Sequence, residues 1–261
     1  MTVPWRHVGV ERDGRLTIVT INRPEVHNAL SAEAHDELEA IFDDFAADPD
    51  QWVAIITGAG EKAFCAGHDL KQQAAGGGLT NPPTGFAGLT ARFDLDKPVI
   101  AAVNGVAMGG GFELALACDI VVASATASFA LPEAKVGLAA LGGGIQRLPR
   151  EIGLKRAMGM LLTGRRLSAA QGLVLGFVNE VAEDGDLLSL ARRWAGEILA
   201  CSPMSIRATK DAVRRGQTAP IEQAIVEQWS YPAMAAMLAS EDYVEGPAAF
   251  AEKRVPEWRG R

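Results

Sequence analysis

The segment KPVIAAVNGVAMGGGFELALACD, residues 97–119, decides the fold because it passes from strand to loop to helix within a few residues. Its first part, up to Val103, is apolar and of strand length. The dipeptide Asn104-Gly105 predicts a turn, and the glycines at 109–111 open a helix that we expect to end near Cys118. A buried strand followed so closely by a helix is typical of α/β proteins.

The same alternation continues on both sides of this segment. Further strands are predicted at Leu16–Asn22, Trp52–Thr57, Ile120–Ala123 and Phe129–Leu131, which are short and rich in β-branched or aromatic residues. A helix is predicted to begin after Ser31 as N-cap and to end at Asp48-Pro49, with an apolar face formed by Ala34, Leu38, Ile41, Phe42 and Phe45. The order of these elements from residue 16 to about residue 180 predicts an α/β fold.

The C-terminal third of the chain is predicted to be helical. Ser168 and Gln171 form a capping-box pattern, and helices are expected at Asp186–Leu199, Ser202–Arg215 and Ile221–Ala239. The last of these would carry an apolar face made of Ala224, Ile225, Trp229, Ala233 and Met237. Such a face fits either a subunit interface or the core of the chain itself.

Composition and charge exclude several classes of protein. The 261 residues carry a formal net charge of −7, and the predicted helix over 31–47 holds six acidic residues and no Lys or Arg, which argues against nucleic-acid binding. No signal peptide and no membrane-spanning apolar run is found. The three cysteines and four histidines show no disulfide or metal-ligand spacing, so we expect a cytoplasmic protein without a metal.

Two glycine-containing loops are candidate sites for negative charge. The first is KAFCAGHDLK at 62–71, directly after a predicted strand, and the second is NGVAMGGGFELALACD at 104–119. Each places backbone N–H groups beside a helix start, where the helix dipole also favours a developing negative charge. For either loop taken alone, an ordinary turn is the favoured interpretation.

Two glutamates among apolar neighbours are candidate acid–base groups. Glu113 lies in the first turn of its predicted helix, on the same face as Leu116 and Ala117, and Glu133 lies in the apolar segment FALPEAKVGL. Carboxylates are rarely buried without a partner or a chemical role. The alternatives are a helix-dipole partner for Glu113 and a surface pair between Glu133 and Lys135.

Together, these segments resemble the crotonase family of enoyl-CoA hydratases and isomerases. The resemblance rests on the two loops and on FALPEAK (129–135), GGGIQRL (142–148), TGRRLS (163–168), Ser202-Pro203 and EGPAAFAEKR (245–254), which cover nearly the whole chain in order. It implies a spiral of repeated ββα units over residues 1–195, followed by a helical trimerisation region over residues 196–261. Homotrimers, or hexamers built from two trimers, are the expected assemblies.

The resemblance also implies a chemistry and its residues. The backbone N–H groups of His68 and Gly110 would form an oxyanion hole for the thioester carbonyl, and Glu113 with Glu133 would flank the substrate double bond. Because the hydratases use both glutamates and the isomerases generally only the second, the pair predicts reversible addition of water to an enoyl-CoA. An isomerase, a thioesterase, a dehalogenase or a non-catalytic acyl-CoA binder remains the alternative.

For the CoA part of the substrate, the resemblance points to the first loop and to the tail. Ala66, His68 and Leu70 would contact the adenine through their main chain, Lys62, Asp69 and Lys71 lie in the same loop, and Lys253 would reach the CoA phosphates bound to a neighbouring subunit. Solvated charge is the alternative for the three lysines. The His68 side chain is expected to shape the pocket, and no cofactor beyond the CoA of the substrate is implied.

The acyl group is not fixed by these motifs. The stretches at 85–90, 94–105 and 240–261 are most similar to a branch of the family whose acyl group carries trimethylammonium, whereas His68 replaces an aromatic residue of that branch. A short-chain enoyl-CoA is the broader expectation.

Overall fold

Two β-sheets, between which the chain passes back and forth, form the centre of the protein. The computed structural model describes residues 5–70, 81–183 and 185–261. The larger sheet has the order β1-β2-β3-β5-β7-β10 and the smaller one β4-β6-β8-β9. Their bounds are β1 (Val8–Asp13), β2 (Leu16–Ile21), β3 (Val53–Gly58), β4 (Ala63–Cys65), β5 (Val99–Val103), β6 (Val106–Met108), β7 (Ile120–Ser124), β8 (Ser128–Ala130), β9 (Leu167–Ser168) and β10 (Glu180–Ala182).

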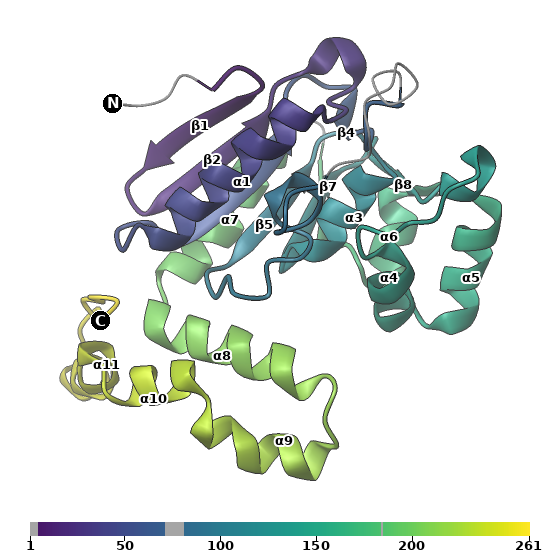
Figure 1. Cartoon of the computed structure of the whole chain (residues 1–261). Helices are drawn as coiled ribbons and strands as arrows, with labels where there is room; N and C mark the ends of the chain where they lie inside the picture. The colour runs from purple at the N-terminus through teal and green to yellow at the C-terminus, as the bar shows by residue number, and fades with distance from the viewer. Residues whose placement is uncertain (1–4, 71–80, 184) are drawn as a thin grey trace.

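Over the middle of the chain, from β3 to β8, successive strands belong to alternate sheets, which produces the spiral. From β3 to β8 each strand of the large sheet is followed by one of the small sheet, and neighbouring strands within each sheet over this part are parallel. Only β1 with β2 and β8 with β9 pair antiparallel in the described residues. This repeated arrangement is the predicted ββα spiral, and Figure 1 shows its strands stacked beside helix α3.

In the described residues, ten α-helices and four 3-10 segments follow the strands of the spiral or extend beyond it. The α-helices are α1 (Ala32–Ala47), α3 (Gly110–Ala117), α4 (Gly144–Ile152), α5 (Leu154–Thr163), α6 (Ala169–Leu175), α7 (Leu187–Leu199), α8 (Pro203–Gly216), α9 (Ile221–Glu227), α10 (Pro232–Leu238) and α11 (Glu241–Glu252). The 3-10 segments are η1 (Pro24–Val26), η2 (Phe86–Gly88), η3 (Glu133–Val136) and η4 (Gln228–Ser230).

Alternating side chains of the large sheet fill two separate cores. Ile55 and Ile100 pack with Ala191 and Ala195 of α7 on one face of the sheet. The next residues along the same strands, such as Ile56, belong to the core that includes α1 and the small sheet. Burial on both faces explains why these strands are continuous apolar runs, which is typical of parallel sheets.

The predicted ends of three helices are confirmed. Ser31 accepts a hydrogen bond from the Ala34 N–H at the start of α1, and Ser168 forms a complete capping box with Gln171 at the start of α6. Helix α3 begins in the glycine loop at Gly110 and ends at Ala117. The side-chain cap satisfies N–H groups that have no partner within the first helical turn.

The prediction of one continuous helix over Ile221–Ala239 is wrong. The structure has α9, the 3-10 turn η4 and then α10, which begins at Pro232. Proline has no N–H to donate within a helix and is favoured at the first helical position, so a new helix begins there. Ile225 and Trp229 therefore do not share one helix face with Met237, and both are exposed.

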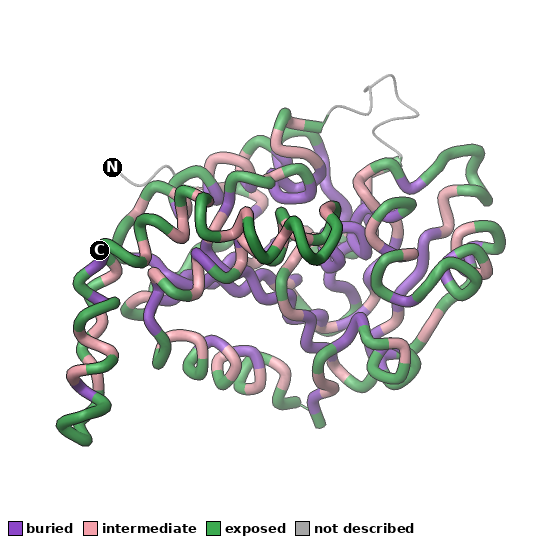
Figure 2. Tube along the Cα trace, turned by 90° about the horizontal axis from the view of Figure 1, so that it is seen from below, coloured by how far each residue is buried: buried purple, intermediate pink, exposed green. Residues whose placement is uncertain are grey.

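The last four helices extend away from the spiral. Helix α7 packs on β3, β5 and β7, so residue 195 lies within a helix of the spiral, and the chain leaves the sheet only after Leu199. Figure 1 shows α8 to α11 below the sheets, and their residues are mostly exposed or half-buried, as the burial colours of Figure 2 indicate. The division into two domains at this point stays a prediction. No helix in the described part of the chain is long and apolar enough to cross a membrane.

Candidate active site

The two glycine-containing loops of the sequence meet in the structure. Gly67 has a positive φ of +91°, and a Cβ placed on it would lie 3.2 Å from the Gly110 nitrogen. Only glycine adopts this backbone conformation and permits this close approach without strain. The first loop is also tied to the start of α1, because Leu30 N–H donates to Gly67 O and Asp69 N–H donates to Leu30 O.

The contact between the loops leaves two backbone donors side by side. The N–H groups of His68 and Gly110 donate to no acceptor within residues 5–70, 81–183 and 185–261. Gly110 is the first residue of α3, where an N–H has no acceptor within the helix. A Cβ on Gly110 would lie 2.4 Å from the Phe86 ring, so the second loop is packed tightly in its place. Such a pair of oriented donors suits an oxygen that gains negative charge.

Glu113 points its carboxylate into a tight backbone loop. Its side chain is buried, with 4% exposed, and Oε1 accepts a hydrogen bond of 2.8 Å from the Gly144 N–H. A Cβ on Gly142 would lie 2.6 Å from Oε2, so residue 142 leaves no room for a side chain. Burial raises the pKa of Glu113 to about 7, the Gly144 N–H opposes this rise, and the charge of Glu133 adds to it.

Glu133 lies at the first residue of η3 and faces the second loop. Its Oε1 is 3.2 Å from the position of a Cβ built on Gly109, and its buried Oε2 has no hydrogen-bond partner in the described structure. Burial raises the pKa of this carboxyl, against the effect of its own backbone N–H. Lys135 is not its partner, since the ammonium group donates to Gly164 O at 2.9 Å. The surface pair that the sequence left open is therefore absent.

The two glutamates are brought together from different elements. The charge of Glu133 raises the pKa of Glu113, which requires the carboxyls to be near each other. Gly109 links them, because its carbonyl accepts from the Glu113 N–H and its Cα adjoins the Glu133 carboxyl. Two neighbouring carboxyls whose pKa values are raised by burial can act as proton donor and acceptor toward a bound molecule.

The residues predicted to bind CoA are only partly gathered at this site. Ala66 N–H donates to His27 O, Asp69 forms an ion pair with Arg23 at 3.3 Å, and Leu70 is 45% exposed. Lys62 is exposed at the start of the same loop. Lys71 lies outside the described residues.

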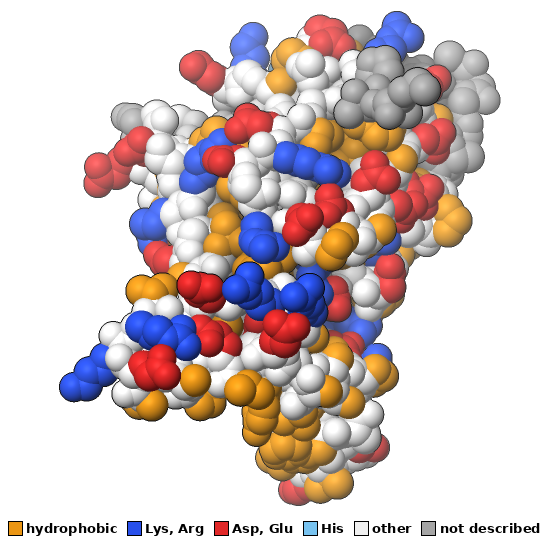
Figure 3. All heavy atoms as spheres, turned by 90° about the vertical axis from the view of Figure 1, so that its left-hand side faces the viewer, with side chains coloured by type: hydrophobic (Ala, Val, Ile, Leu, Met, Phe, Trp, Pro, Cys, Tyr) orange, Lys and Arg blue, Asp and Glu red, His pale blue; other side chains and the backbone are white. Residues whose placement is uncertain are grey.

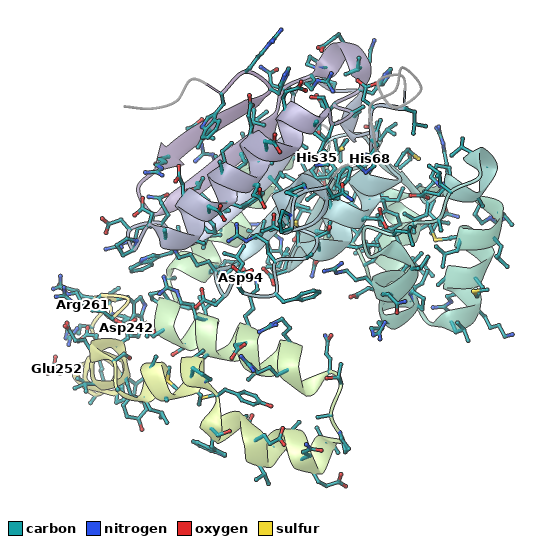
Figure 4. All side chains as sticks on the ribbon, viewed as in Figure 1. His35, His68, Asp94, Asp242, Glu252 and Arg261 are labelled. Carbon is teal, nitrogen blue, oxygen red and sulfur yellow. The ribbon has the colours of Figure 1, made fainter. Side chains whose placement is uncertain are left out.

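Lys253 is far from the site within one chain. It caps the C-terminal end of α11, and Figure 4 labels its neighbour Glu252 at the lower left of the molecule, far from His68. Its predicted role requires a neighbouring subunit, and that role stays a prediction.

Four residues around the site were not identified from sequence. Gly142 and Gly144 enclose the Glu113 carboxylate, although their segment was recognised as part of the family pattern. His35 and Phe86 pack beside His68. The run of three glycines at 142–144 is the sequence signal that points to Gly142 and Gly144.

Two features of the described structure lie apart from this chemistry. A cavity of about 560 Å³ separates α8 from the outer ends of α3 and α4, and neither glutamate lines it. No group of three or more His, Cys, Asp or Glu side chains in the described ranges is arranged to hold a metal ion.

Comparison with known proteins gives consistent matches over almost the whole chain. The family described as enoyl-CoA hydratase/isomerase matches residues 11–261. Carnitinyl-CoA dehydratases of Escherichia coli K12 and Shigella flexneri are 46% identical over 254 residues, which is 96% of this chain and 97% of theirs. An enoyl-CoA hydratase structure from Mycobacterium tuberculosis H37Rv is 40% identical with a TM-score of 0.92, covering 98% of this chain and 99% of that one. A second, from Mycobacterium marinum, is 41% identical with a TM-score of 0.91 and the same coverage.

Proposed function

Because the chain belongs to the enoyl-CoA hydratase/isomerase family, we propose that it is a hydro-lyase that adds water reversibly across the 2,3 double bond of an enoyl-CoA thioester. The observation that carries this proposal is a pair of carboxyls, the buried Glu113 and the half-buried Glu133 with its buried Oε2, beside two unengaged backbone N–H groups.

In this proposal the N–H groups of His68 and Gly110 bind the thioester carbonyl oxygen. Negative charge grows on that oxygen as water adds to C3 and the C2 side becomes enolate-like. Donors already held in place stabilise this charge, and removing one such donor typically costs about 3 kcal/mol of transition-state stabilisation. The contact of Gly67 with the Gly110 nitrogen supports this role, since it fixes the two donors relative to each other.

The carboxyl pair supplies the proton transfers. One carboxylate accepts a proton from water while the water oxygen bonds to C3, and the other carboxyl gives a proton to C2. One O–H bond of the water is broken and one C–H bond forms, so the charges balance over the two glutamates. Because the two carboxyls lie together, the hydroxyl group at C3 and the proton at C2 would add to the same face of the double bond.

The hydratase is favoured over the isomerase by how Glu113 is held. An isomerase that shifts a double bond requires one proton-transferring carboxyl, and a second buried carboxyl would only reduce stability. Here Glu113 has a dedicated donor, the Gly144 N–H, and two glycines that leave space for its oxygens. This arrangement supports a chemical role for the first glutamate as well as the second.

For the remainder of the substrate, we propose that the main chain of Ala66, His68 and Leu70 contacts the adenine. Lys62 and Lys71 would lie near the CoA phosphates, and no further cofactor takes part. The protein would act in the cytoplasm.

A trimer or a hexamer is supported by exposed apolar side chains on the C-terminal helices. Figure 3 shows a hydrophobic patch at the lower end of the molecule, over these helices. Ile221, Ile225, Val226 and Trp229 are between 55% and 72% exposed. Large exposed apolar patches mark interaction sites, and a subunit interface is one of these.

A second candidate is the hydration of an enoyl-CoA with a trimethylammonium group. The observation that favours it is the 46% identity with carnitinyl-CoA dehydratases. The two candidates share one mechanism and differ only in the acyl group.

The test is hydration of crotonyl-CoA in water enriched in ¹⁸O, followed by loss of enoyl absorbance and by mass spectrometry of the product. The proposal expects a 3-hydroxyacyl-CoA with one ¹⁸O at C3. Turnover of a 3-enoyl-CoA to the 2-enoyl isomer, without incorporation of ¹⁸O, would instead identify an isomerase. Crotonobetainyl-CoA is assayed in parallel to separate the two acyl groups.

A further inference from the structure

A pair of histidines stands directly behind the first loop. His35 of α1 is buried, with 1% exposed, and its Nε2 lies 3.4 Å from Nδ1 of the half-buried His68. Phe86 packs edge-on against both rings, with centroids 4.7 and 4.9 Å away. Figure 4 labels the two histidines next to each other between α1 and the start of α3. The mechanism above uses only the backbone of His68 and leaves its imidazole without a role.

The direction of the hydrogen bonds in this pair is set by the backbone. The Ala87 N–H donates to His35 Nδ1 at 3.0 Å, and since that nitrogen accepts, the ring proton of neutral His35 is on Nε2. His35 then donates to His68 Nδ1. Burial lowers the pKa of His35 to about 3, with the charge of His68 acting in the same direction, and burial lowers the pKa of His68 as well. Both rings are neutral near pH 7, so the single proton of His68 is on Nε2.

The Nε2–H of His68 is the free end of this chain of donors. The contact with His35 involves Nδ1, Nε2 has no hydrogen-bond partner among the described residues, and the His68 side chain is half-buried. The ring packs on Phe86, and Phe86 in turn packs on Gly110, the residue that supplies the second carbonyl donor. The imidazole ring therefore lies beside the carbonyl site.

We propose that the His68 side chain, oriented by His35, donates a hydrogen bond to a neutral oxygen on the acyl chain beyond C3. This inference rests on the proposed hydratase function and names its substrate class. A plain alkyl chain would cover the N–H without giving it an acceptor, which is unfavourable. A trimethylammonium group has no lone pair to accept the bond, and an acyl carboxylate would lie near Glu113 and Glu133.

The experiment compares isosteric substrates that differ by a hydroxyl in place of a methyl group. The pairs are 4-hydroxybut-2-enoyl-CoA with pent-2-enoyl-CoA, and 5-hydroxypent-2-enoyl-CoA with hex-2-enoyl-CoA. For the wild type we expect kcat/KM to be about tenfold higher for the hydroxylated member of at least one pair. In His68→Phe, which keeps a ring and removes the N–H, the ratio within that pair should fall to about one. The alkyl member serves as the internal control for any general loss of activity.

A second measurement does not depend on a variant. ¹⁵N NMR of the histidine rings should show His68 protonated on Nε2 and unprotonated on Nδ1 at pH 7. The inference would be overturned if neither pair showed a preference for the hydroxylated substrate, or if the preference survived in His68→Phe. A proton on Nδ1 would also overturn it. So would a kcat/KM for crotonobetainyl-CoA higher than that for both hydroxylated substrates. Those results would leave the hydratase intact, whereas no turnover of any enoyl-CoA would overturn both proposals.

Discussion

Replacing Glu113 by Gln is expected to stabilise the protein at alkaline pH. The side chain is 4% exposed, and its pKa is raised from 4.5 to about 7, chiefly by burial. The folded protein therefore binds a proton at Glu113 that the unfolded chain has already lost between these two pH values. A difference of this size corresponds to about 3 kcal/mol of unfolding free energy.

The sign follows from the raised pKa. The contribution of the protonated carboxyl is fully present below pH 4.5 and is lost as the pH rises through about 7, where the buried group must ionise. Wild-type stability should therefore fall over this range. Glu113→Gln keeps an acceptor oxygen for the Gly144 N–H but never ionises, so its stability should fall less.

The assay is urea unfolding followed by tryptophan fluorescence at fixed protein concentration, at pH values from 5 to 8.5. With an m-value near 3 kcal/mol/M, the midpoint of Glu113→Gln should exceed that of the wild type by about 1 M at pH 8, and the gap should nearly close at pH 5. The matched control is Glu25→Gln, an exposed glutamate in η1, whose midpoints should follow the wild type. Midpoints of Glu113→Gln that run parallel to the wild type, or lie below it at pH 8, would refute the reasoning.

Two further variants test the loops. Gly142→Ala places a methyl group 2.6 Å from Glu113 Oε2, so kcat for hydration should fall about 10²-fold. The control is Gly159→Ala in α5, where a Cβ would meet nothing within 4 Å. This control variant should retain activity and gain a little stability. Equal activity of these two variants in the crotonyl-CoA assay would contradict the placement of Glu113. Gly110→Ala forces the second loop away from Phe86, so we expect kcat to fall about 10²–10³-fold. Circular dichroism checks that the variant is folded. A folded variant with wild-type activity would exclude Gly110 as a carbonyl donor.

Elements with a local signal could be predicted from the sequence. The helix α1 was predicted with its cap and its apolar face, because Ser31 and the periodic residues after it act within a few turns. The buried strands β3, β5 and β7 were predicted because β-branched residues fill both faces of a parallel sheet.

Other elements lacked such a signal. Strand β1 was missed because five of its six residues are exposed and its pairing with β2 is what forms it. The break of the helix at Pro232 had a local signal in the proline itself, but the apolar spacing on both sides suggested continuity.

The same contrast applies to the site. The burial of Glu113 could be predicted from its apolar helix face, and the structure confirms it. Its hydrogen bond to Gly144 joins residues 31 positions apart, and the Ala87 N–H meets His35 across 52 positions. No spacing rule connects such residues, since the spiral of strands brings them together. The histidine pair was therefore outside the reach of sequence reasoning, although His35 lies on the apolar face of a correctly predicted helix.

The measurement that tests the central claim most directly is the initial rate of crotonyl-CoA hydration for Glu113→Gln, Glu133→Gln and the double variant. If the two carboxyls act on one water as a unit, each single change should lower kcat about 10²–10⁴-fold, and the double variant should be little slower than the slower single variant. A double variant whose loss equals the product of the two single losses would show that the carboxyls act independently. Single variants that retain wild-type kcat would contradict the two-carboxylate account altogether.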